Sequence, residues 1–168
     1  MSATQPQLLQ IPLNPGDVVY TPDWVARDMV EYFHPTGRIL EPCSGDGAFL
    51  KYLPTADWCE ITKGRDFFAC HEHYDWIVGN PPYSIFAQWL RASFDRAADI
   101  VYLIPTLRCW ISSRIMKDIR DYGGIVTIAV YDEDNFPEWN INFVISAIHF
   151  RRGYTGPINV VFRDRPKP

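Results

Sequence analysis

The sequence lacks several features that would place the protein in a special class. Its four cysteines form no CxxC pair and no regular framework, which argues against a disulfide-stapled secreted domain and indicates free thiols. No apolar run approaches the length of a membrane span, and the N-terminus has neither the basic start nor the apolar stretch of a signal peptide. Internal repeats and low-complexity segments are absent too. We therefore expect a cytoplasmic protein that does not contact a membrane.

Positive charge is also in short supply. The 168 residues carry 16 Lys and Arg against 20 Asp and Glu, and the net charge of −4 argues against a protein that grips nucleic acid through its overall field. Basic residues gather locally over 108–120 and 151–167, and a solvated face is the plain interpretation of each group. With 47% apolar and 15% aromatic residues, the composition is typical of one globular domain with a sizeable core.

Short apolar runs alternate with helical patterns along the chain. Strands are predicted over 38–40, 58–61, 75–78, 100–104, 125–130 and 143–150. Helices are predicted after an N-cap at Thr21 with Pro22 at the first helical position, from residue 48, after Ser84, and over 112–122. This alternation predicts an α/β fold whose mostly parallel sheet is covered on both faces. Ligands bind beyond the carboxyl ends of such strands, so the loops 41–47 and 79–83 are expected to open at the same edge.

The loop Asn80-Pro81-Pro82-Tyr83 carries the clearest chemical signal. An aromatic amino group such as that of adenine is a poor nucleophile, because its lone pair is delocalised into the ring. Two acceptors on its two hydrogens free that lone pair, and the Asn80 side-chain oxygen and the Pro81 carbonyl can supply them. The prolines stiffen the loop, and Tyr83 offers a face on which a base can stack. A proline-rich turn after a strand would not explain the flanking Asn and Tyr.

The second loop is Glu41-Pro42-Cys43-Ser44-Gly45-Asp46-Gly47-Ala48-Phe49. Glycines after a strand let the backbone approach a ligand closely. The third glycine of a dinucleotide fingerprint is missing, and Asp46 would repel a pyrophosphate. The loop therefore suits a cofactor with a cationic, amino-acid-like end, although a tight strand-to-helix turn explains it equally well when it is taken alone.

Together these motifs resemble the S-adenosylmethionine-dependent methyltransferases that modify adenine N6 in DNA, over about the whole chain after residue 17. The resemblance implies S-adenosylmethionine as cofactor and a Rossmann-like fold with an antiparallel last strand. It makes Asn80, Pro81, Pro82 and Tyr83 the catalytic motif, and it implies that Tyr83 or Phe136 stacks on a flipped-out or single-stranded target base. The cofactor-binding residues that it implies are Tyr20, Thr21, Pro22, Glu41, Pro42, Gly45, Gly47, Phe49, Glu60, Asp66, Phe67 and Asn80.

The chain is most similar in compactness to small adenine methyltransferases of phages and prophages, which work in the cytoplasm of a bacterial or phage-infected cell. The resemblance divides it into an N-terminal arm (1–16), a catalytic domain (17–153) and a C-terminal tail (154–168). In two respects the chain departs from the family. Only five residues separate Glu60 from Asp66, so the usual helix there is missing or trimmed. The target-recognition region of sequence-specific relatives is not visible either.

Without that region, the protein is expected to contact mainly nucleic-acid phosphates, and a homodimer or an accessory subunit is the expected source of specificity. The residues predicted to bind the backbone are Arg108, Arg114, Lys117, Arg151 and Arg152. No metal site is expected, because residues 70–73 pack their Cys, His and Glu side chains too tightly for zinc spacing. Three alternatives stay open: adenine in structured RNA, a protein glutamine amide as substrate, and a non-catalytic subunit with the same fold.

Overall fold

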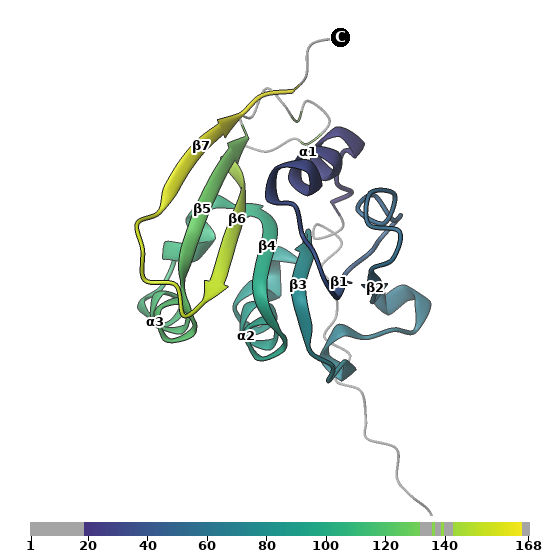
Figure 1. Ribbon diagram of the computed structural model, residues 1–168, viewed down its shortest axis with the longest axis horizontal. Helices are drawn as coiled ribbons and strands as arrows, with labels where there is room; N and C mark the ends of the chain where they lie inside the picture. Colours follow the sequence, from purple (N-terminus) through teal and green to yellow (C-terminus); the bar gives the residue numbers. More distant parts are fainter. Residues whose placement is uncertain (1–18, 132–135, 137–138, 140–142, 166–168) are drawn as a thin grey trace, which may run out of the picture.

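The computed structural model of the chain describes residues 19–131, 136, 139 and 143–165. These residues form a seven-stranded sheet with the order β2-β1-β3-β4-β6-β5-β7 (Figure 1). The strands are β1 (Ile39–Glu41), β2 (Asp57–Trp58), β3 (Tyr74–Gly79), β4 (Ala97–Pro105), β5 (Gly123–Tyr131), β6 (Ile145–Arg152) and β7 (Asn159–Arg163). The α-helices are α1 (Asp23–Phe33), α2 (Phe86–Arg96) and α3 (Ser113–Tyr122), and the 3₁₀ turns are η2 (Ile61–Lys63), η3 (Phe67–Ala69), η4 (Tyr83–Ile85) and η5 (Thr106–Trp110).

The sheet is mostly parallel. Strands β2, β1, β3 and β4 run in one direction, and only β6 is antiparallel to its neighbours β4 and β5. In Figure 1 the arrow of β6 accordingly points the opposite way from that of β5. The predicted Rossmann-like fold is therefore confirmed, with the expected antiparallel strand inserted between two strands of the other direction.

Helices cover the two faces of the sheet. On one face, α1 buries Val25, Ala26 and Met29 against strand residues such as Val78 and Val101. On the other face, α2 and α3 pack against the side chains that alternate with those. The helical spacing of Phe86, Trp89, Leu90, Ser93 and Phe94 explains why α2 forms and which side it buries. No described helix is both long and apolar enough to cross a membrane.

The C-terminal segment differs from the prediction of a tail. Residues Asn159–Arg163 form β7, which pairs in parallel with β5 at the edge of the sheet. The Arg163 guanidinium also forms an ion pair with the Asp28 carboxylate of α1. The Tyr131 hydroxyl donates a further hydrogen bond of 2.6 Å to the same carboxylate. Since Val160 and Phe162 stay exposed, the strand shows little of the hydrophobic burial that a sequence pattern detects.

The helix predictions are correct in part. Helix α3 has the predicted N-cap, because the Ser112 hydroxyl accepts a hydrogen bond from Ile115 N at 3.3 Å. Helix α1 starts one residue later than predicted, with Pro22 as its N-cap. Residues 45–52 form successive turns in place of the predicted helix. Between β2 and β3 the described chain has only 3₁₀ turns, as the short spacing from Glu60 to Asp66 predicts.

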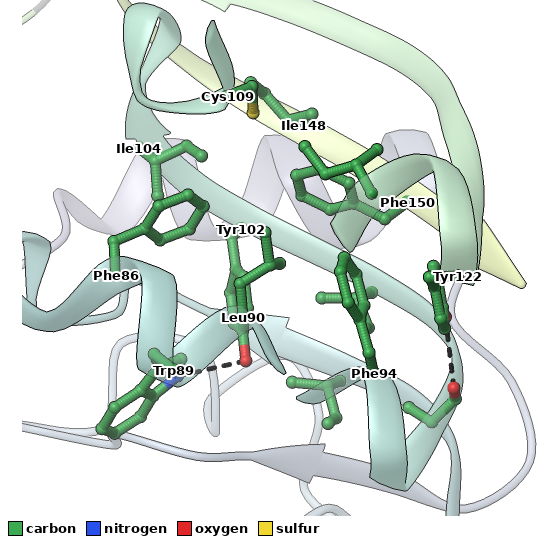
Figure 2. Packing of buried hydrophobic residues seen from close by; sticks show 14 of the residues in the cluster. Phe86, Trp89, Leu90, Phe94, Tyr102, Ile104, Cys109, Tyr122, Ile148 and Phe150 are labelled. Carbon is green, nitrogen blue, oxygen red and sulfur yellow. Dashed lines mark hydrogen bonds between the residues drawn. The ribbon is translucent and has the colours of Figure 1, made fainter. Parts of the chain in front are cut away.

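A polar network is buried in the core between α2 and β4. The Tyr102 hydroxyl of β4 accepts a hydrogen bond from Trp89 Nε1 at 3.1 Å (Figure 2). It also lies 2.7 Å from the Ser93 hydroxyl. Ser93 in turn donates to the Trp89 carbonyl oxygen at 2.7 Å, and Tyr102 is fully buried. The network ties α2 to β4, the strand next to the one that carries Asn80.

Removal of the Tyr102 hydroxyl should therefore be costly. We predict that Tyr102→Phe lowers the free energy of unfolding by about 1–3 kcal/mol, because Trp89 Nε1 loses its buried acceptor. Urea-induced unfolding measures the change. Tyr52→Phe is the matched control, since the Tyr52 hydroxyl donates to Asp23 at the surface and should matter much less. Equal losses in the two variants would contradict the prediction.

Candidate active site

The two predicted loops lie together at one edge of the sheet. Strands β1 and β3 are parallel neighbours, so the loop after Glu41 and the loop after Gly79 leave the sheet side by side. The strand that follows β1 in sequence, β2, is added on one side of β1, whereas β3 and β4 are added on the other side. The order of strands therefore switches between β1 and β3. Such switch points are where ligands bind in open α/β sheets.

The loops are in direct contact. Cβ of a side chain at position 79 would lie 3.2 Å from Pro42 Cδ, so glycine permits this approach. The Cys43 thiol donates a hydrogen bond of 3.1 Å to the Asn80 backbone oxygen. Burial raises the pKa of that thiol well above its ordinary value, which keeps the proton on the sulfur and available for donation. Cys43, which the sequence analysis did not include in the site, thus links its two halves.

The Asn80 carboxamide has a defined orientation. Its Nδ2 donates to the Val19 backbone oxygen at 3.0 Å and to the Thr21 hydroxyl at 3.2 Å. A carbonyl oxygen can only accept, so the atom that faces Val19 must be the amide nitrogen. The amide oxygen is therefore turned away from the N-terminal segment. This contact also explains why Thr21 does not cap α1: its hydroxyl is used by Asn80.

The two prolines of the predicted catalytic motif are fixed by burial. Pro81 and Pro82 are buried, whereas Asn80 and Tyr83 keep part of their surface exposed. Tyr83 begins η4 and packs against the hydrophobic clusters of both sheet faces. Two proline rings in a buried setting fix the backbone that presents the Pro81 carbonyl.

The glycine loop after β1 is built by unusual backbone angles. Gly45 and Gly47 have φ values of +51° and +88°, a region that favours glycine. Tyr20 lies over this loop, since Cβ at position 45 would be 3.7 Å from its ring. Glu60 accepts a hydrogen bond from Gly45 N at 2.8 Å, and Lys63 Nζ donates to Gly45 O at 3.0 Å. Glu60, which is predicted to bind the cofactor, therefore also connects the segment after β2 to the glycine loop.

Glu41 is the most unusual ionisable group of the site. It is 1% exposed, and its Oε2 atom has no hydrogen-bond partner among the described residues. Burial, followed by the negative charges of Asp46 and Glu60, raises its pKa from 4.5 to about 8. A buried carboxyl that lacks a partner fits a ligand with a cationic group.

Several predicted cofactor residues have structural contacts as well. Asp66 caps η3 by accepting a hydrogen bond from Phe68 N at 2.9 Å. Phe67 is 2% exposed and packs on Trp89 with ring centroids 4.6 Å apart. Phe49 is buried in the cluster under α1. A contact of these side chains with a cofactor stays a prediction.

The structure buries Phe136, one of the two predicted base-stacking residues. Phe136 is 1% exposed and stacks on Trp139 with ring centroids 4.5 Å apart, while Trp24 and Tyr131 contact its other sides. Tyr83, which is partly exposed and belongs to the catalytic motif itself, is the better placed of the two.

The predicted backbone-binding residues fall into two groups. Arg108 and Arg114 lie just after β4, at the carboxyl edge beside Asn80, and Lys117 follows one turn later on α3. Arg151 and Arg152 end the antiparallel strand β6, opposite Asp99 and Gly123, and therefore lie at the other edge of the sheet.

Arg151 and Arg152 contact other groups of the protein at that edge, and their binding of a nucleic-acid backbone stays a prediction. Arg151 pairs with Asp99 at 2.7 Å, and Arg152 donates to the carbonyl oxygens of Phe94 and Ala97. The antiparallel direction of β6, which the residue pattern does not reveal, places both residues at that edge.

Within the described part of the chain, no group of three or more Cys, His, Asp or Glu is placed to hold a metal ion.

The state of Glu41 predicts a pH dependence of stability. Between pH 4.5 and about 8, the folded protein holds a proton that the unfolded chain has released, so stability falls as the pH rises through this window. Glu41→Gln stays neutral. We predict that the free energy of unfolding of Glu41→Gln, measured relative to that of the parent, is larger at pH 8 than at pH 4.5. The difference should grow by about 1.4 kcal/mol per pH unit within this window. Urea unfolding at both pH values measures this, and a difference that does not change with pH would contradict it.

Three solved structures show which known fold this arrangement matches. A class I S-adenosylmethionine-dependent methyltransferase from Listeria monocytogenes has a TM-score of 0.65 at 13% identity, over 86% of this chain and 65% of that protein. A modification subunit assigned to a type I restriction enzyme of Vibrio vulnificus has a TM-score of 0.60 at 15% identity, over 92% of this chain and 48% of that one. An RNA methyltransferase from Pyrococcus horikoshii has a TM-score of 0.51 at 11% identity, over 77% of this chain and 79% of that one.

No protein-family model matches the sequence, and no curated protein matches it either. The chain spans less than two thirds of the Listeria protein and about half of the Vibrio subunit. The shared sheet and the loops at its carboxyl edge nevertheless give a clear result. The chain has the fold of S-adenosylmethionine-dependent methyltransferases.

Proposed function

We propose that this protein transfers a methyl group from S-adenosylmethionine to the N6 amino group of adenine in DNA. The observation that carries the proposal is the meeting of the Glu41 and Asn80 loops at one sheet edge. There the Asn80 amide oxygen is turned away from Val19 and Thr21. One loop suits a cationic cofactor, and the other suits an aromatic amine.

The residues of the glycine loop fit the cofactor by charge. Glu41 would face its cationic end, and the backbone at Gly45 and Gly47 leaves room for close approach. Tyr20, Glu60 and Asp66 would line the remaining part, and Thr21, Pro22, Pro42, Phe49 and Phe67 would support it. When bound, S-adenosylmethionine supplies a methyl group that is activated by a positively charged sulfur.

The catalytic motif would act on the target amine. The Asn80 side-chain oxygen and the Pro81 backbone oxygen would accept the two amine hydrogens, which draws the nitrogen towards tetrahedral geometry and frees its lone pair. Because Val19 and Thr21 hold the amide, this acceptor is aimed before the substrate arrives. Tyr83 would stack on the base, which reaches the pocket only when it is flipped out or single-stranded.

Arg108, Arg114 and Lys117 would bind the phosphates, because they lie at the same edge as the catalytic motif. Adenine is favoured over a protein glutamine amide by the Glu41-Pro42 pair together with the Thr21-Pro22 segment. The modification subunit of the Vibrio restriction enzyme, which has the same fold, is consistent with a DNA substrate and with an accessory specificity subunit.

The experiment that tests the proposal separates the substrate classes. The purified protein is incubated with S-adenosylmethionine labelled in its methyl group and, separately, with DNA, RNA and protein. Nucleoside analysis of the products should give N6-methyladenine from DNA. Labelled RNA or labelled glutamine would replace the substrate in the proposal, and no transfer to any of the three together with no binding of the cofactor would refute it.

The first prediction for this activity concerns Asn80. Asn80→Ala removes an acceptor that matters mainly in the transition state, so turnover should fall by an amount equivalent to about 2.7–4 kcal/mol. The stabilisation by S-adenosylmethionine in a thermal melt should stay close to that of the parent. Asn159→Ala, on the exposed edge strand β7, is the matched control and should keep full activity. Near-normal turnover of Asn80→Ala would remove this residue from the chemistry.

The second prediction concerns site choice. These 168 residues offer little surface for the reading of base edges, so a protein made of them alone should methylate adenines in many sequence contexts. Binding should weaken steeply with salt, as it does when phosphate contacts dominate. Mapping of N6-methyladenine in mixed-sequence DNA at two salt concentrations measures both. Methylation confined to one long site by the isolated monomer would show that its own loops read sequence.

A further inference from the structure

The turn that follows β4 exposes an unusual amount of apolar surface. Leu107 is 75% exposed, Ile111 is 62% exposed and Trp110 is 41% exposed, all within five consecutive residues. Water is a poor solvent for such side chains, and a compact set of them on a protein surface usually marks a binding site. We call residues 106–111 the β4 turn.

The β4 turn is anchored rather than loosely attached. Thr106 N donates to Val144 O at 2.9 Å, and the Thr106 hydroxyl lies 2.6 Å from that of Ser146. Cys109 is 1% exposed and points into the core cluster that Figure 2 shows. With its backbone and Cys109 held from below, the turn presents Leu107 and Ile111 outward on a fixed base.

The β4 turn also lies beside the catalytic motif. Gly79 pairs with Tyr102, so β4 continues for three residues beyond that register position before the turn begins. At about 3.3 Å per residue, the turn stands roughly 10 Å further out than the start of the Asn80 loop, on the neighbouring strand. A nucleotide base bound at Asn80 would therefore bring the adjacent nucleotides of the same nucleic-acid strand close to Leu107 and Ile111.

The charge around the β4 turn fits a polyanion. Residues 106–117 contain Arg108, Arg114 and Lys117 and no acidic residue. Within the described part of the chain, no hydrogen bond or ion pair engages the Arg108 or Arg114 guanidinium, whereas Lys117 pairs with Asp121. Apolar side chains set between free cations match a nucleic acid, which has an apolar base stack between two rows of phosphates.

Resting on the proposed function, we propose that the β4 turn is a wedge for base flipping. Leu107 and Ile111 contact the base stack beside the target adenine and fill the space that the adenine leaves, while Arg108 and Arg114 bind the flanking phosphates. The wedge lowers the cost of unstacking a paired base, which is a few kcal/mol. It has nothing to contribute when the target base is already free.

The test compares three substrates of one sequence: a fully paired duplex, the same duplex with an abasic site opposite the target adenine, and the single strand. The double variant Leu107→Ala, Ile111→Ala should lose about 10- to 100-fold in kcat/KM on the paired duplex, since each factor of ten corresponds to about 1.4 kcal/mol. On the other two substrates it should stay close to the parent. Ile158→Ala is the control, because it removes an exposed apolar side chain that lies before β7.

Each other outcome is informative. Equal losses on all three substrates, or no loss on the paired duplex, would overturn the wedge. A change of molecular mass in light scattering without any dependence on the substrate would assign the β4 turn to a protein partner instead. If the parent methylates none of the three substrates, the proposed function itself fails, and the wedge fails with it.

A binding measurement tests the cationic part without any need for catalysis. Arg108→Ala and Arg114→Ala should each reduce the slope of log Kd against log salt by about 1 for the paired duplex, because each removes one phosphate contact. Arg151→Ala, at the opposite edge, should leave the slope unchanged. Unchanged slopes for both Arg108→Ala and Arg114→Ala would overturn the assignment of phosphate contacts to this turn.

Discussion

The close approach of two loops at the ends of β1 and β3 is the contact on which the site depends. It is possible because Gly79 leaves space for Pro42, and it is held by the bond from the Cys43 thiol to the Asn80 backbone oxygen. A thiol that lost its proton could not donate this bond. Burial prevents that loss by raising the thiol pKa, so the same desolvation that makes the thiol unreactive preserves its structural role.

The segment before α1 closes the site from the other side and connects it to the far end of the chain. Val19 and Thr21 hold the Asn80 amide, and the helix that follows carries Asp28, the ion-pair partner of Arg163 on β7. This pair is mostly shielded from water, and Tyr131 adds a hydrogen bond to the same carboxylate. Charge-assisted hydrogen bonds of this kind are stronger than exposed ion pairs. Contacts from both ends of the described chain therefore fix the position of α1 and of the segment before it, which holds the Asn80 amide.

Much of the fold could be predicted from the sequence, because apolar runs and caps report local structure. The Ser112 cap of α3, the strand before Asn80 and the missing helix after Glu60 all left a local signal. Features set by long-range pairing did not. The direction of β6 decides where Arg151 lies, and the docking of β7 depends on a helix more than a hundred residues away in the sequence. For the site, motif spacing identified the two loops, whereas the roles of Val19 and Cys43 arise only from contacts made in the fold.

The distribution of charge along the edge that carries the candidate site reconciles an acidic protein with the proposed polyanionic substrate. The acidic residues Asp46 and Glu60 follow β1 and β2, where a cationic cofactor would bind, and the buried Glu41 beside them adds a negative charge only when it loses its proton. The basic residues of 106–117 follow β4, which is separated from β1 by β3. Two strand spacings amount to about 10 Å, which is close to the Debye length of roughly 8–10 Å at physiological salt. The exposed charges of each half are therefore partly screened from those of the other, so the local sign of charge has more influence than the net charge of −4 on which ligand each half attracts.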